Sequence, residues 1–473
     1  MDLLFSKGIT LRAYIHKPFG TNQQIHIRAP GGDSFHVEKI KVFQSMTEKL
    51  LDFKTFSVII VNMNDDIEIF RSQFVKNLKA FKDEHIIKIL CGVRRCGKST
   101  ILKTYKSELL SLGVKESNII ERLYSSMDYQ DDFDSHSMYS DLSAAIKNAS
   151  QTNKIYLLLD EVQEVEDWEK CINSLFESSN VDIYVTGSNS KLLSSEISTY
   201  LTGRFVLIPV YTLSFAEFIE FKKTYSPSLQ NASTDEYFDL YLKSGGFPFV
   251  AKTNHTQEEN YQVVDGIYAT VVTRDISKRH NISNLEMFNR VVRFILENLG
   301  KNFSAKTIFD FFKSQQRSIA IETIYNYLIW LEEAFIIYRC NRYDIQGKEV
   351  LKTQEKYYLS DISFKYSQLG YSPKAVASIL ENLVYLELRR RGYNIYIGKI
   401  ADKEIDFIAS RQDEKIYVQV CRTLPEDSDR ELGNLKAVRD NFPKYVVTMD
   451  SSVCGNEDGI KIVHIKDFLT QEW

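Results

Sequence analysis

The segment from Gly92 to Thr100 has the residue types and the spacing of a phosphate-binding loop. Its nine residues are, in order, Gly92, Val93, Arg94, Arg95, Cys96, Gly97, Lys98, Ser99 and Thr100. They fit the pattern Gly-x4-Gly-Lys-Ser/Thr, in which two glycines let successive backbone N–H groups point at phosphate oxygens. Lys98 would reach the β- and γ-phosphates, and the Ser99 hydroxyl would bind Mg²⁺. The loop therefore predicts that the chain binds ATP together with Mg²⁺.

Two adjacent carboxylates supply the rest of the expected chemistry. The apolar run that starts at Tyr156 ends in Asp160 and Glu161. Asp160 is placed to hold Mg²⁺, directly or through water, and Glu161 to polarise an attacking water molecule. An apolar strand that ends in Asp-Glu is common in itself, so the prediction of an ATPase depends on the combination with the loop.

Two further residues are candidates for sensing or stabilising charge on the γ-phosphate. Asn189, or Ser188 beside it, follows the expected strand 181–186 and could contact the γ-phosphate, although a plain polar turn explains either residue equally well. Arg204 could stabilise the leaving phosphate within one chain or across a subunit interface. A surface or ion-paired arginine is an equally good interpretation. Catalytic candidates are thus Lys98, Asp160, Glu161, Asn189 and Arg204.

The two arginines inside the loop have a simpler explanation. We expect Arg94 and Arg95 to hold partner carboxylates rather than to take part in the chemistry.

Alternating strands and helices must position these residues. Between residues 67 and 211 the strand candidates are 86–91, 119–124, 154–159, 181–186 and 205–209, and the clearest helical patterns are 99–112 and 167–178. Such alternation predicts a parallel sheet with helices on both faces. Residues 212–285 have a mostly helical pattern, broken by Gly245, Gly246 and Pro248.

The bulk properties bound the class of protein. A chain of 473 residues with 44% hydrophobic and 26% charged residues predicts an α/β protein of several domains. A formal net charge of −4 excludes a basic, non-specific nucleic-acid binder. The six cysteines are scattered, and the longest apolar runs are too short to cross a bilayer. With no secretory pattern at the N-terminus, we expect a cytoplasmic protein without a membrane partner.

The stretch 286–371 has the outline of a winged helix-turn-helix. Helical patterns over 288–299, 305–313 and 321–333 precede two short strand candidates at 335–339 and 356–359. The third helix could present Glu322, Thr323 and Asn326 to DNA bases, with phosphate contacts from Lys301, Lys306, Lys313 and Arg317. That helix is also apolar and aromatic, which favours packing, and winged helices serve as protein-binding modules as well. DNA and a protein partner both stay open.

Taken together, the ordered motifs resemble a family of prokaryotic AAA-like ATPases with a C-terminal domain of unknown function. The resemblance rests on residues 92–100, 159–163, 186–190, 201–204, 244–248 and 274–276. It runs from about residue 67 to residue 473. It implies an AAA-like core at 67–211, a helical lid at 212–285, a winged helix at 286–371 and a restriction-endonuclease-like fold at 372–473. Residues 1–66, with one strand candidate at 56–61, form an extension without a motif.

The last of these domains has an incomplete nuclease set. We expect a helix at 376–391, strands at 394–398, 405–409, 416–421, 445–448 and 460–464, and a helix at 427–441. A nuclease needs paired carboxylates for a metal and usually a lysine. Asp406 is in place, but Gln419 stands where a glutamate is expected and Cys421 where a lysine is; Glu381 or Glu404 could complete a metal pair. Glu381, Asp406 and Gln419 are therefore degenerate, and a retained fold with a binding role is favoured over cleavage.

Three hypotheses follow from the residues. The preferred one is an ATP-driven switch that controls the C-terminal domains and directs them to a partner, with DNA favoured. The second is a nucleotide-loaded scaffold or regulator that hydrolyses slowly and binds a protein. The third is an ATP-dependent nuclease. A catalytic role for Arg204 between subunits would require a homo-oligomer.

Overall fold

The computed structural model describes four short strands before residue 70 and most of the chain after it. The described residues are 2–5, 9–12, 59–61, 67–69, 71–129, 132–149, 153–189, 201, 203–424 and 431–473. Strand β1 (Asp2–Phe5) pairs antiparallel with β2 (Ile9–Arg12), and β3 (Ile59–Val61) pairs antiparallel with β4 (Ile67–Ile69). The strand predicted at 56–61 thus forms at 59–61, while residues 56–58 lie outside the described part.

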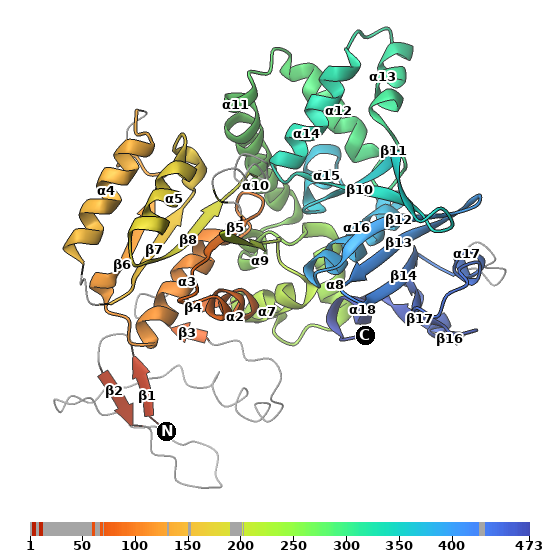
Figure 1. The fold of residues 1–473 in the computed structure, drawn as a ribbon. Helices are drawn as coiled ribbons and strands as arrows, with labels where there is room; N and C mark the ends of the chain where they lie inside the picture. Colours follow the sequence, from red (N-terminus) through yellow and green to blue (C-terminus); the bar gives the residue numbers. More distant parts are fainter. Residues whose placement is uncertain are drawn as a thin grey trace, which may run out of the picture.

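A five-stranded parallel sheet forms the first α/β unit (Figure 1). Its strands are β5 (Ile87–Cys91), β6 (Ile119–Leu123), β7 (Ile155–Asp160), β8 (Val181–Gly187) and β9 (Phe205–Pro209). The spatial order is β6-β7-β8-β5-β9, and each neighbouring pair runs parallel. These strands agree with the predicted ones to within one residue at each end. Strand β5, which leads into the glycine loop, lies between β8 and β9.

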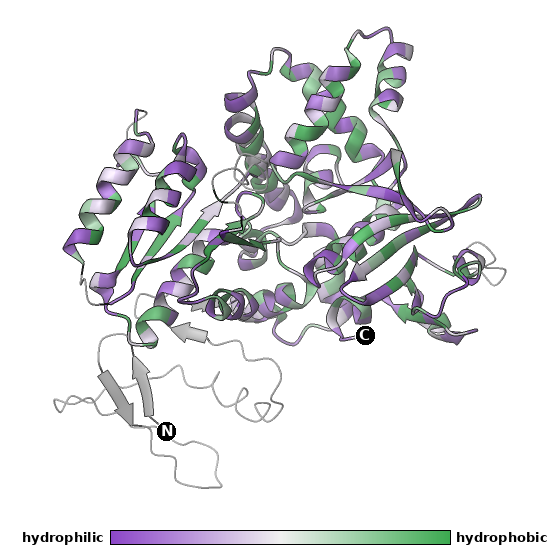
Figure 2. Cartoon of the chain, viewed as in Figure 1, coloured by the Kyte–Doolittle hydropathy of each residue, from purple (hydrophilic) through white to green (hydrophobic). Residues whose placement is uncertain are grey.

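Helices cover this sheet because each has one apolar face. Helix α2 (Ser72–Ala80) packs against α3 (Lys98–Ser111), and α4 (Ser135–Asn148) packs against α5 (Trp168–Ser178). Members of both pairs contact the sheet, through α3 on β7 and β8 and through α5 on β8. Figure 2 shows hydrophobic and hydrophilic colours alternating along α4 and α5, as expected of helices that bury one side. The predicted helices at 99–112 and 167–178 are confirmed.

The next segment is helical, as the sequence pattern predicts. It contains α7 (Phe215–Tyr225), the 3₁₀ turn η4 (Pro227–Leu229), α8 (Thr234–Ser244), α9 (Pro248–Lys252), α10 (Gln257–Thr270), the π-helix η5 (Val271–Ser277) and α11 (Lys278–His280). Capping boxes begin α7, α8 and α10, in which a Ser or Thr side chain and a Glu three residues later satisfy free N–H groups. Gly245, with a φ of +72°, ends α8, and Pro248 begins α9.

Three helices and a long hairpin follow. The helices are α12 (Leu285–Glu297), α13 (Ala305–Ser314) and α14 (Ile321–Glu333), and the hairpin consists of β10 (Ile337–Asp344) and β11 (Glu349–Leu359). Phe303 forms an isolated antiparallel bridge with Glu355 on the hairpin. The helices lie where the sequence predicts them. The hairpin is much longer than the two short strands expected at 335–339 and 356–359.

This hairpin is also part of a larger, eight-stranded mixed sheet. The order is β11-β10-β12-β13-β14-β15-β17-β16, in which β10 runs parallel to β12 with Arg342 opposite Ile397. The remaining strands are β12 (Asn394–Ile400), β13 (Lys403–Arg411), β14 (Glu414–Cys421), β15 (Lys444–Thr448), β16 (Gly455–Glu457) and β17 (Ile460–His464). One sheet therefore extends across the boundary predicted at residues 371 and 372.

Four helices accompany this second sheet. They are α15 (Ser363–Leu369), α16 (Val376–Arg390), α17 (Glu431–Lys436) and α18 (Ile465–Thr470). Helix α16 agrees with its prediction. The helix expected at 427–441 was too long: residues 437–441 are not helical, and residues 427–430 lie outside the described part.

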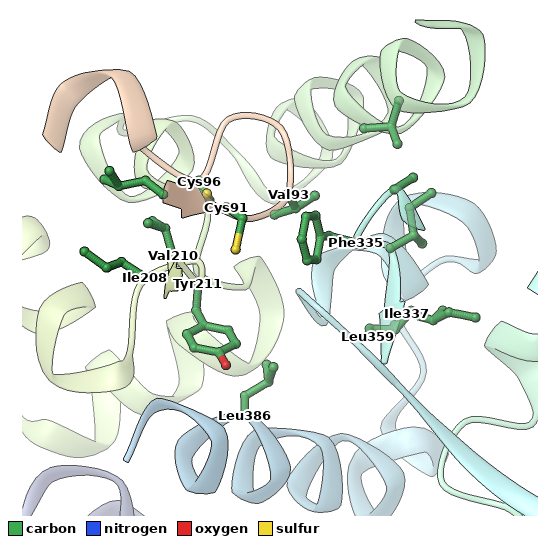
Figure 3. Packing of buried hydrophobic residues seen from close by; sticks show 14 of the residues in the cluster. Cys91, Val93, Cys96, Ile208, Val210, Tyr211, Phe335, Ile337, Leu359 and Leu386 are labelled. Atoms are coloured by element: carbon green, nitrogen blue, oxygen red, sulfur yellow. The ribbon is translucent and has the colours of Figure 1, made fainter. Parts of the chain in front are cut away.

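A continuous hydrophobic cluster joins the two sheets. Figure 3 shows Val93 and Cys96 of the glycine loop in the same cluster as Phe335 before the hairpin and Leu386 of α16. The glycine loop thus belongs to a core that also contains C-terminal residues. In the described part of the chain, no helix has the length and apolar character needed to cross a membrane.

Candidate functional site

The glycine loop connects β5 to α3 in a conformation that needs its glycines. A Cβ on Gly92 would lie 2.0 Å from the carbonyl oxygen of Val210, so only glycine fits there. Gly97 has a φ of +103° and caps α3 without a side chain, which leaves the first N–H groups of that helix available to an anion. The side chains of Val93 and Cys96 are buried in the core, so these residues can offer only their backbone to a nucleotide, while Thr100 is exposed.

Lys98 is held over the loop by backbone groups. Its buried ammonium donates hydrogen bonds to the carbonyl oxygens of Gly92 at 2.9 Å and Val93 at 3.1 Å. The ammonium nitrogen lies 4.0 Å from Oε1 of Glu161. The structure therefore brings the lysine of the loop to the carboxylates at the end of β7.

Thr186 of β8 holds the Asp160 carboxylate and the backbone of Glu161. Its hydroxyl donates to Oδ1 of Asp160 and accepts a hydrogen bond from the backbone N–H of Glu161 at 3.0 Å. Burial raises the pKa of Asp160, although hydrogen bonds from Ser99 and Thr186 act in the opposite direction. One carboxylate with an adjacent hydroxyl is a donor set that suits Mg²⁺, which usually binds one or two carboxylates plus substrate phosphates. Asp160 and Ser99 thus fit the predicted metal site.

Glu161 has a different electrostatic environment. Burial favours its neutral form, but the positive charges of Lys98 and Arg94, together with hydrogen bonds from Gln163 and Ser188, lower the pKa of Glu161. The Gln163 amide donates hydrogen bonds to Oε2 of Glu161 and, at 3.2 Å, to the hydroxyl of Ser188. Glu161 is therefore ionised at neutral pH and held in one orientation. Asn189 follows Ser188 beyond β8 and is buried at the same edge of the sheet.

Arg94 links the loop to the π-helix η5. Its guanidinium donates to both carboxylate oxygens of Asp275, at 2.9 and 2.8 Å, and to Oε1 of Glu164 at 3.2 Å. The Ser188 hydroxyl lies 3.5 Å from Oδ1 of Asp275. These carboxylates raise the pKa of Arg94 against the effect of its burial. The expected partner carboxylates of Arg94 are thus present, whereas Arg95 is exposed.

The structure does not bring Arg204 to the loop of its own chain. Arg204 precedes β9, and its carbonyl oxygen accepts from the N–H of Ile87 at the start of β5. The glycine loop follows the other end of β5, so the length of the strand separates the two. The Arg204 guanidinium contacts Asn173 and Glu177 of α5, each at 2.5 Å. A role within one chain is thus not supported by this placement, and a role between subunits stays a prediction.

A second cluster of a lysine with carboxylates lies on the larger sheet. The ammonium of Lys356 on β11 lies 2.8 Å from Glu381, 3.0 Å from Glu404 and 3.5 Å from Asp406. The Tyr358 hydroxyl also donates to Glu381 at 2.6 Å. We call Lys356, Glu381, Glu404 and Asp406 the Lys356 cluster. Burial raises the pKa of Glu381 to about 7 even though Lys356 and Tyr358 act to lower it.

The backbone of β14 completes the contacts of Asp406. The N–H of Val420 donates to Oδ2 of Asp406 at 2.9 Å, and Gln419 accepts from the N–H of Asp406 at 3.3 Å. Gln419 thus takes part through its amide oxygen rather than as an anion. In the described part of the chain, no three His, Cys, Asp or Glu side chains are arranged to hold a metal ion. A lysine is present after all, but it comes from the hairpin and occupies the space between the carboxylates.

The helix proposed to read DNA divides its residues between core and surface. On α14, Glu322 and Asn326 are exposed and Thr323 is half-buried, while Ile324 and Leu328 are buried. The four basic residues expected to contact phosphates, Lys301, Lys306, Lys313 and Arg317, are exposed or half-buried. The helix therefore packs with one face and leaves the predicted reading face in solvent.

Four residues with clear roles in these sites were not predicted: Thr186, Gln163, Asp275 and Lys356. Thr186, Gln163 and Asp275 lie inside the short motifs that carry the resemblance, which was the available signal. Lys356 had no local signal, because nothing near it in sequence marks it as a partner of Glu381 or Asp406.

Comparison with known proteins gives two domain matches. A family model described as an AAA domain matches residues 84–219, and one described as a domain of unknown function matches residues 235–375. The first match covers the five-stranded sheet, the glycine loop and the two carboxylates. This part of the chain has an AAA-type, P-loop ATPase-like fold.

Full-length relatives exist in a bacterium and an archaeon. An uncharacterized protein of Haemophilus influenzae is 37% identical over 403 residues, which cover 85% of this chain and 99% of the relative. The uncharacterized protein MJ1544 of Methanocaldococcus jannaschii is 32% identical over 457 residues, with 91% of this chain and 95% of the relative covered. Among solved structures, the Walker-type ATPase PABY2304 of Pyrococcus abyssi matches with a TM-score of 0.47 and 15% identity, over 63% of this chain and 95% of that one.

Proposed function

The chain belongs to one family with these uncharacterized proteins of Haemophilus influenzae and Methanocaldococcus jannaschii, and we propose that it is a Mg²⁺-dependent ATPase that works as a nucleotide-driven switch. The observation that carries the proposal is the meeting of Lys98 with Glu161 at 4.0 Å, beside Asp160 and Ser99. Two segments that lie far apart in sequence, 92–100 and 160–161, supply the phosphate loop, the metal ligands and a carboxylate for water.

The residues divide the chemistry among them. The N–H groups of the loop and of the start of α3 bind the phosphates, and Lys98 exchanges its two carbonyl partners for β- and γ-phosphate oxygens. Mg²⁺, held by Ser99 and Asp160, would neutralise charge between these phosphates. Glu161 is ionised and oriented by Gln163, so it accepts a hydrogen bond from the attacking water and places it in line with the γ-phosphate.

A link between the loop and the rest of the chain supports the switch. Arg94 in the loop is bound to Asp275 in the π-helix, and π-helical turns occur frequently at functional sites. Farther along the same run of helix, His280 stacks on Trp330 of α14 with 4.5 Å between the ring centroids. Binding or loss of the γ-phosphate would shift Arg94. Asp275 would then transmit this shift to helices α12–α14.

The C-terminal half supplies the proposed output. We propose that helices α12–α14 with the β10–β11 hairpin form a winged helix, and that α16 with β12–β15 form a restriction-endonuclease-like fold. Glu322 and Asn326 are exposed, as contacts from α14 to the bases of duplex DNA would require. The alternative is a slowly hydrolysing scaffold that binds a protein through the same helices.

Nuclease activity is the least favoured alternative. Lys356 lies between the carboxylates that a metal would need, and Gln419 lacks the charge of the expected glutamate. Three carboxyl groups match the charge of Lys356 within the cluster, and we therefore assign the cluster a structural role.

The test is ATP hydrolysis with Mg²⁺, measured with and without duplex DNA. We expect turnover that disappears in Lys98→Ala, and turnover that rises with duplex DNA under the switch hypothesis. Turnover indifferent to DNA would favour the scaffold. Unchanged turnover in Lys98→Ala would overturn the ATPase proposal itself.

A further inference from the structure

An open cleft of about 1040 Å³ lies on the larger sheet, away from the glycine loop. Its walls come from the turn of the β10–β11 hairpin at 345–348, the turn between β12 and β13 at 400–403, strand β14, and residues 436–440 after α17. Figure 1 shows α17 beside β13 and β14, at the end of this sheet. None of the residues discussed for ATP lines the cleft.

The charge of the cleft is opposite to that of the chain. Five basic residues line it, namely Lys348, Lys403, Lys415, Lys436 and Arg439, against the two acidic residues Asp402 and Asp440. Five positive minus two negative charges give +3, whereas the whole chain carries −4. Such a local excess of positive charge in a concave site attracts anions.

Four of these cations have no carboxylate partner among the described residues, and one of the four, Lys403, donates to the carbonyl oxygen of Gly433 at 3.1 Å. The fifth, Lys436, pairs with Glu457 at 3.1 Å and Asp458 at 2.8 Å. Lys348 and Arg439 are exposed and form no ion pair there. The Lys415 ammonium lies over the ring of Phe442, 4.8 Å from its centroid. The acidic residue Asp440 is already engaged, because its Oδ2 accepts from the Tyr417 hydroxyl at 2.6 Å. The positive charge of the cleft is therefore available to a ligand.

The floor of the cleft is apolar and aromatic. Ile345, Ile400, Ile408 and Val438 line it, together with Tyr343. Tyr343 is half-buried and packs against Tyr396, with 5.8 Å between the ring centroids. A ligand that fits must combine several negative charges with flat, apolar groups.

We propose that this cleft binds single-stranded nucleic acid. Phosphates would contact Lys348, Lys415 and Arg439, and bases would lie on the floor against Tyr343, which is the usual division of labour in single-strand binding. A duplex keeps its bases paired and stacked, so their faces would not be free to lie on Tyr343. An acidic peptide would match the charges but leave the aromatic floor without a partner. The site is separate from the ATP loop and does not depend on the ATPase proposal.

The experiment measures fluorescence anisotropy of a labelled oligothymidylate, without ATP, on the full chain. The triple variant Lys348→Ala, Lys415→Ala, Arg439→Ala is compared with the matched control Lys76→Ala, Lys115→Ala, Lys374→Ala, which removes three exposed cations that lie outside both the cleft and the segment proposed to bind DNA. We expect the cleft variant to bind about tenfold or more weakly. The magnitude of its slope of log affinity against log salt should decrease by about 2, near 0.7 for each lost phosphate contact. The control should bind like the unaltered protein.

Every other result would overturn the proposal. These results are absence of binding, equal binding by the cleft variant, and an equal loss in the control. Displacement of the oligonucleotide by polyglutamate at equal charge would indicate a peptide site, and tighter binding of duplex than of single strand through the same three cations would indicate a duplex site. Thermal unfolding of both variants, measured alongside, separates a lost site from a lost fold. Since no ATP is present, failure here leaves the ATPase proposal untouched.

Discussion

The molecule contains two places where a lysine meets carboxylates, and they differ in what satisfies the lysine. Lys98 is bound to two backbone carbonyls and lies 4.0 Å from the nearest carboxylate oxygen. Lys356 contacts three carboxylates at 2.8, 3.0 and 3.5 Å. Lys98 can exchange weak neutral partners for phosphates, whereas the charge of Lys356 is already matched within the protein.

The difference teaches how to separate a site from a structural network. Both lysines are buried beside acidic groups, so burial and nearby charge alone do not distinguish them. Only the first stands at a loop whose backbone N–H groups and left-handed Gly97 prepare a place for an anion. We therefore expect variants at Lys98 to change catalysis, and variants at Lys356 to change stability.

The largest expected effect is on turnover at the first site. Lys98→Ala should lower ATP hydrolysis by at least about 10²–10³-fold, because a charged contact that strengthens in the transition state is lost. ATP should also no longer raise the unfolding temperature of this variant. Steady-state hydrolysis and thermal unfolding check this, and Arg95→Ala, an exposed cation in the same loop, should behave like the unaltered protein.

The next effect is on stability at the second site. Lys356→Ala should lower the free energy of unfolding by about 3–5 kcal/mol, because buried carboxylates lose their cation. Denaturant unfolding measures this, and Lys348→Ala on the same hairpin, exposed and without an ion pair among the described residues, is the control. A Lys356→Ala protein of undiminished stability would contradict the structural assignment and reopen the nuclease hypothesis.

The two sites also differ in how far the sequence predicts them. Lys98, Asp160 and Ser99 could be predicted because each stands in a short motif whose neighbours set its local geometry. Lys356 could not, because its contact with Glu381 depends on strand pairing between distant segments, such as Arg342 opposite Ile397. Local patterns predict strands but not the strands with which they pair. The continuity of the eight-stranded sheet could therefore not be predicted from the sequence either.

Arg204 shows the same limit from the other side. The residue type suits phosphate chemistry. Its position before β9, however, places it at the amino ends of the parallel strands, whereas the loop lies at their carboxyl ends. Asp275 is the converse case, since it lies 181 positions from Arg94 and is still its closest charged partner. The sequence gives the residue type, but it does not give the end of the sheet at which a side chain lies or the distant residue that it contacts.

The pH dependence of stability sharpens the comparison further. The pKa of Glu381 is raised from 4.5 to about 7, so the folded state binds its proton more tightly than the unfolded state does. Stability from this group is fully present below pH 4.5 and is lost as the pH rises to about 7. Relative to Glu381→Gln, the unaltered protein should lose on the order of 2 kcal/mol between pH 4.5 and pH 7.5.

Denaturant unfolding of both proteins across that pH range measures the difference. Asp406, whose pKa is also raised by burial, contributes with the same sign in both proteins. A difference that stays constant with pH would mean that folding does not shift the pKa of Glu381. That outcome would show that Lys356 and Tyr358 fully offset the burial of this carboxyl group.

A smaller effect is expected where the first site meets the rest of the chain. Asp275→Asn leaves Arg94 with Glu164 as its remaining carboxylate partner, and residues that couple sites typically contribute about 0.5–2 kcal/mol. We expect ATP affinity to change by roughly tenfold or less while the response of turnover to DNA disappears. Titration of ATP and DNA-dependent turnover measure the two quantities separately, and a full DNA response in Asp275→Asn would exclude this link as the route.

The smallest effect is expected at Arg204, which separates chemistry within one chain from chemistry between chains. Its side chain is 40% exposed and paired with Glu177, and an exposed pair of this kind contributes about 0–1 kcal/mol to stability. At concentrations where the protein is a monomer, Arg204→Ala should hydrolyse ATP within about twofold of the unaltered rate.

Measuring turnover per subunit against protein concentration separates the two possibilities. A rate that rises with concentration in the unaltered protein, but not in Arg204→Ala, would place Arg204 in a neighbouring subunit's site. A large loss in the dilute monomer would contradict the position of Arg204 at the opposite edge of the sheet.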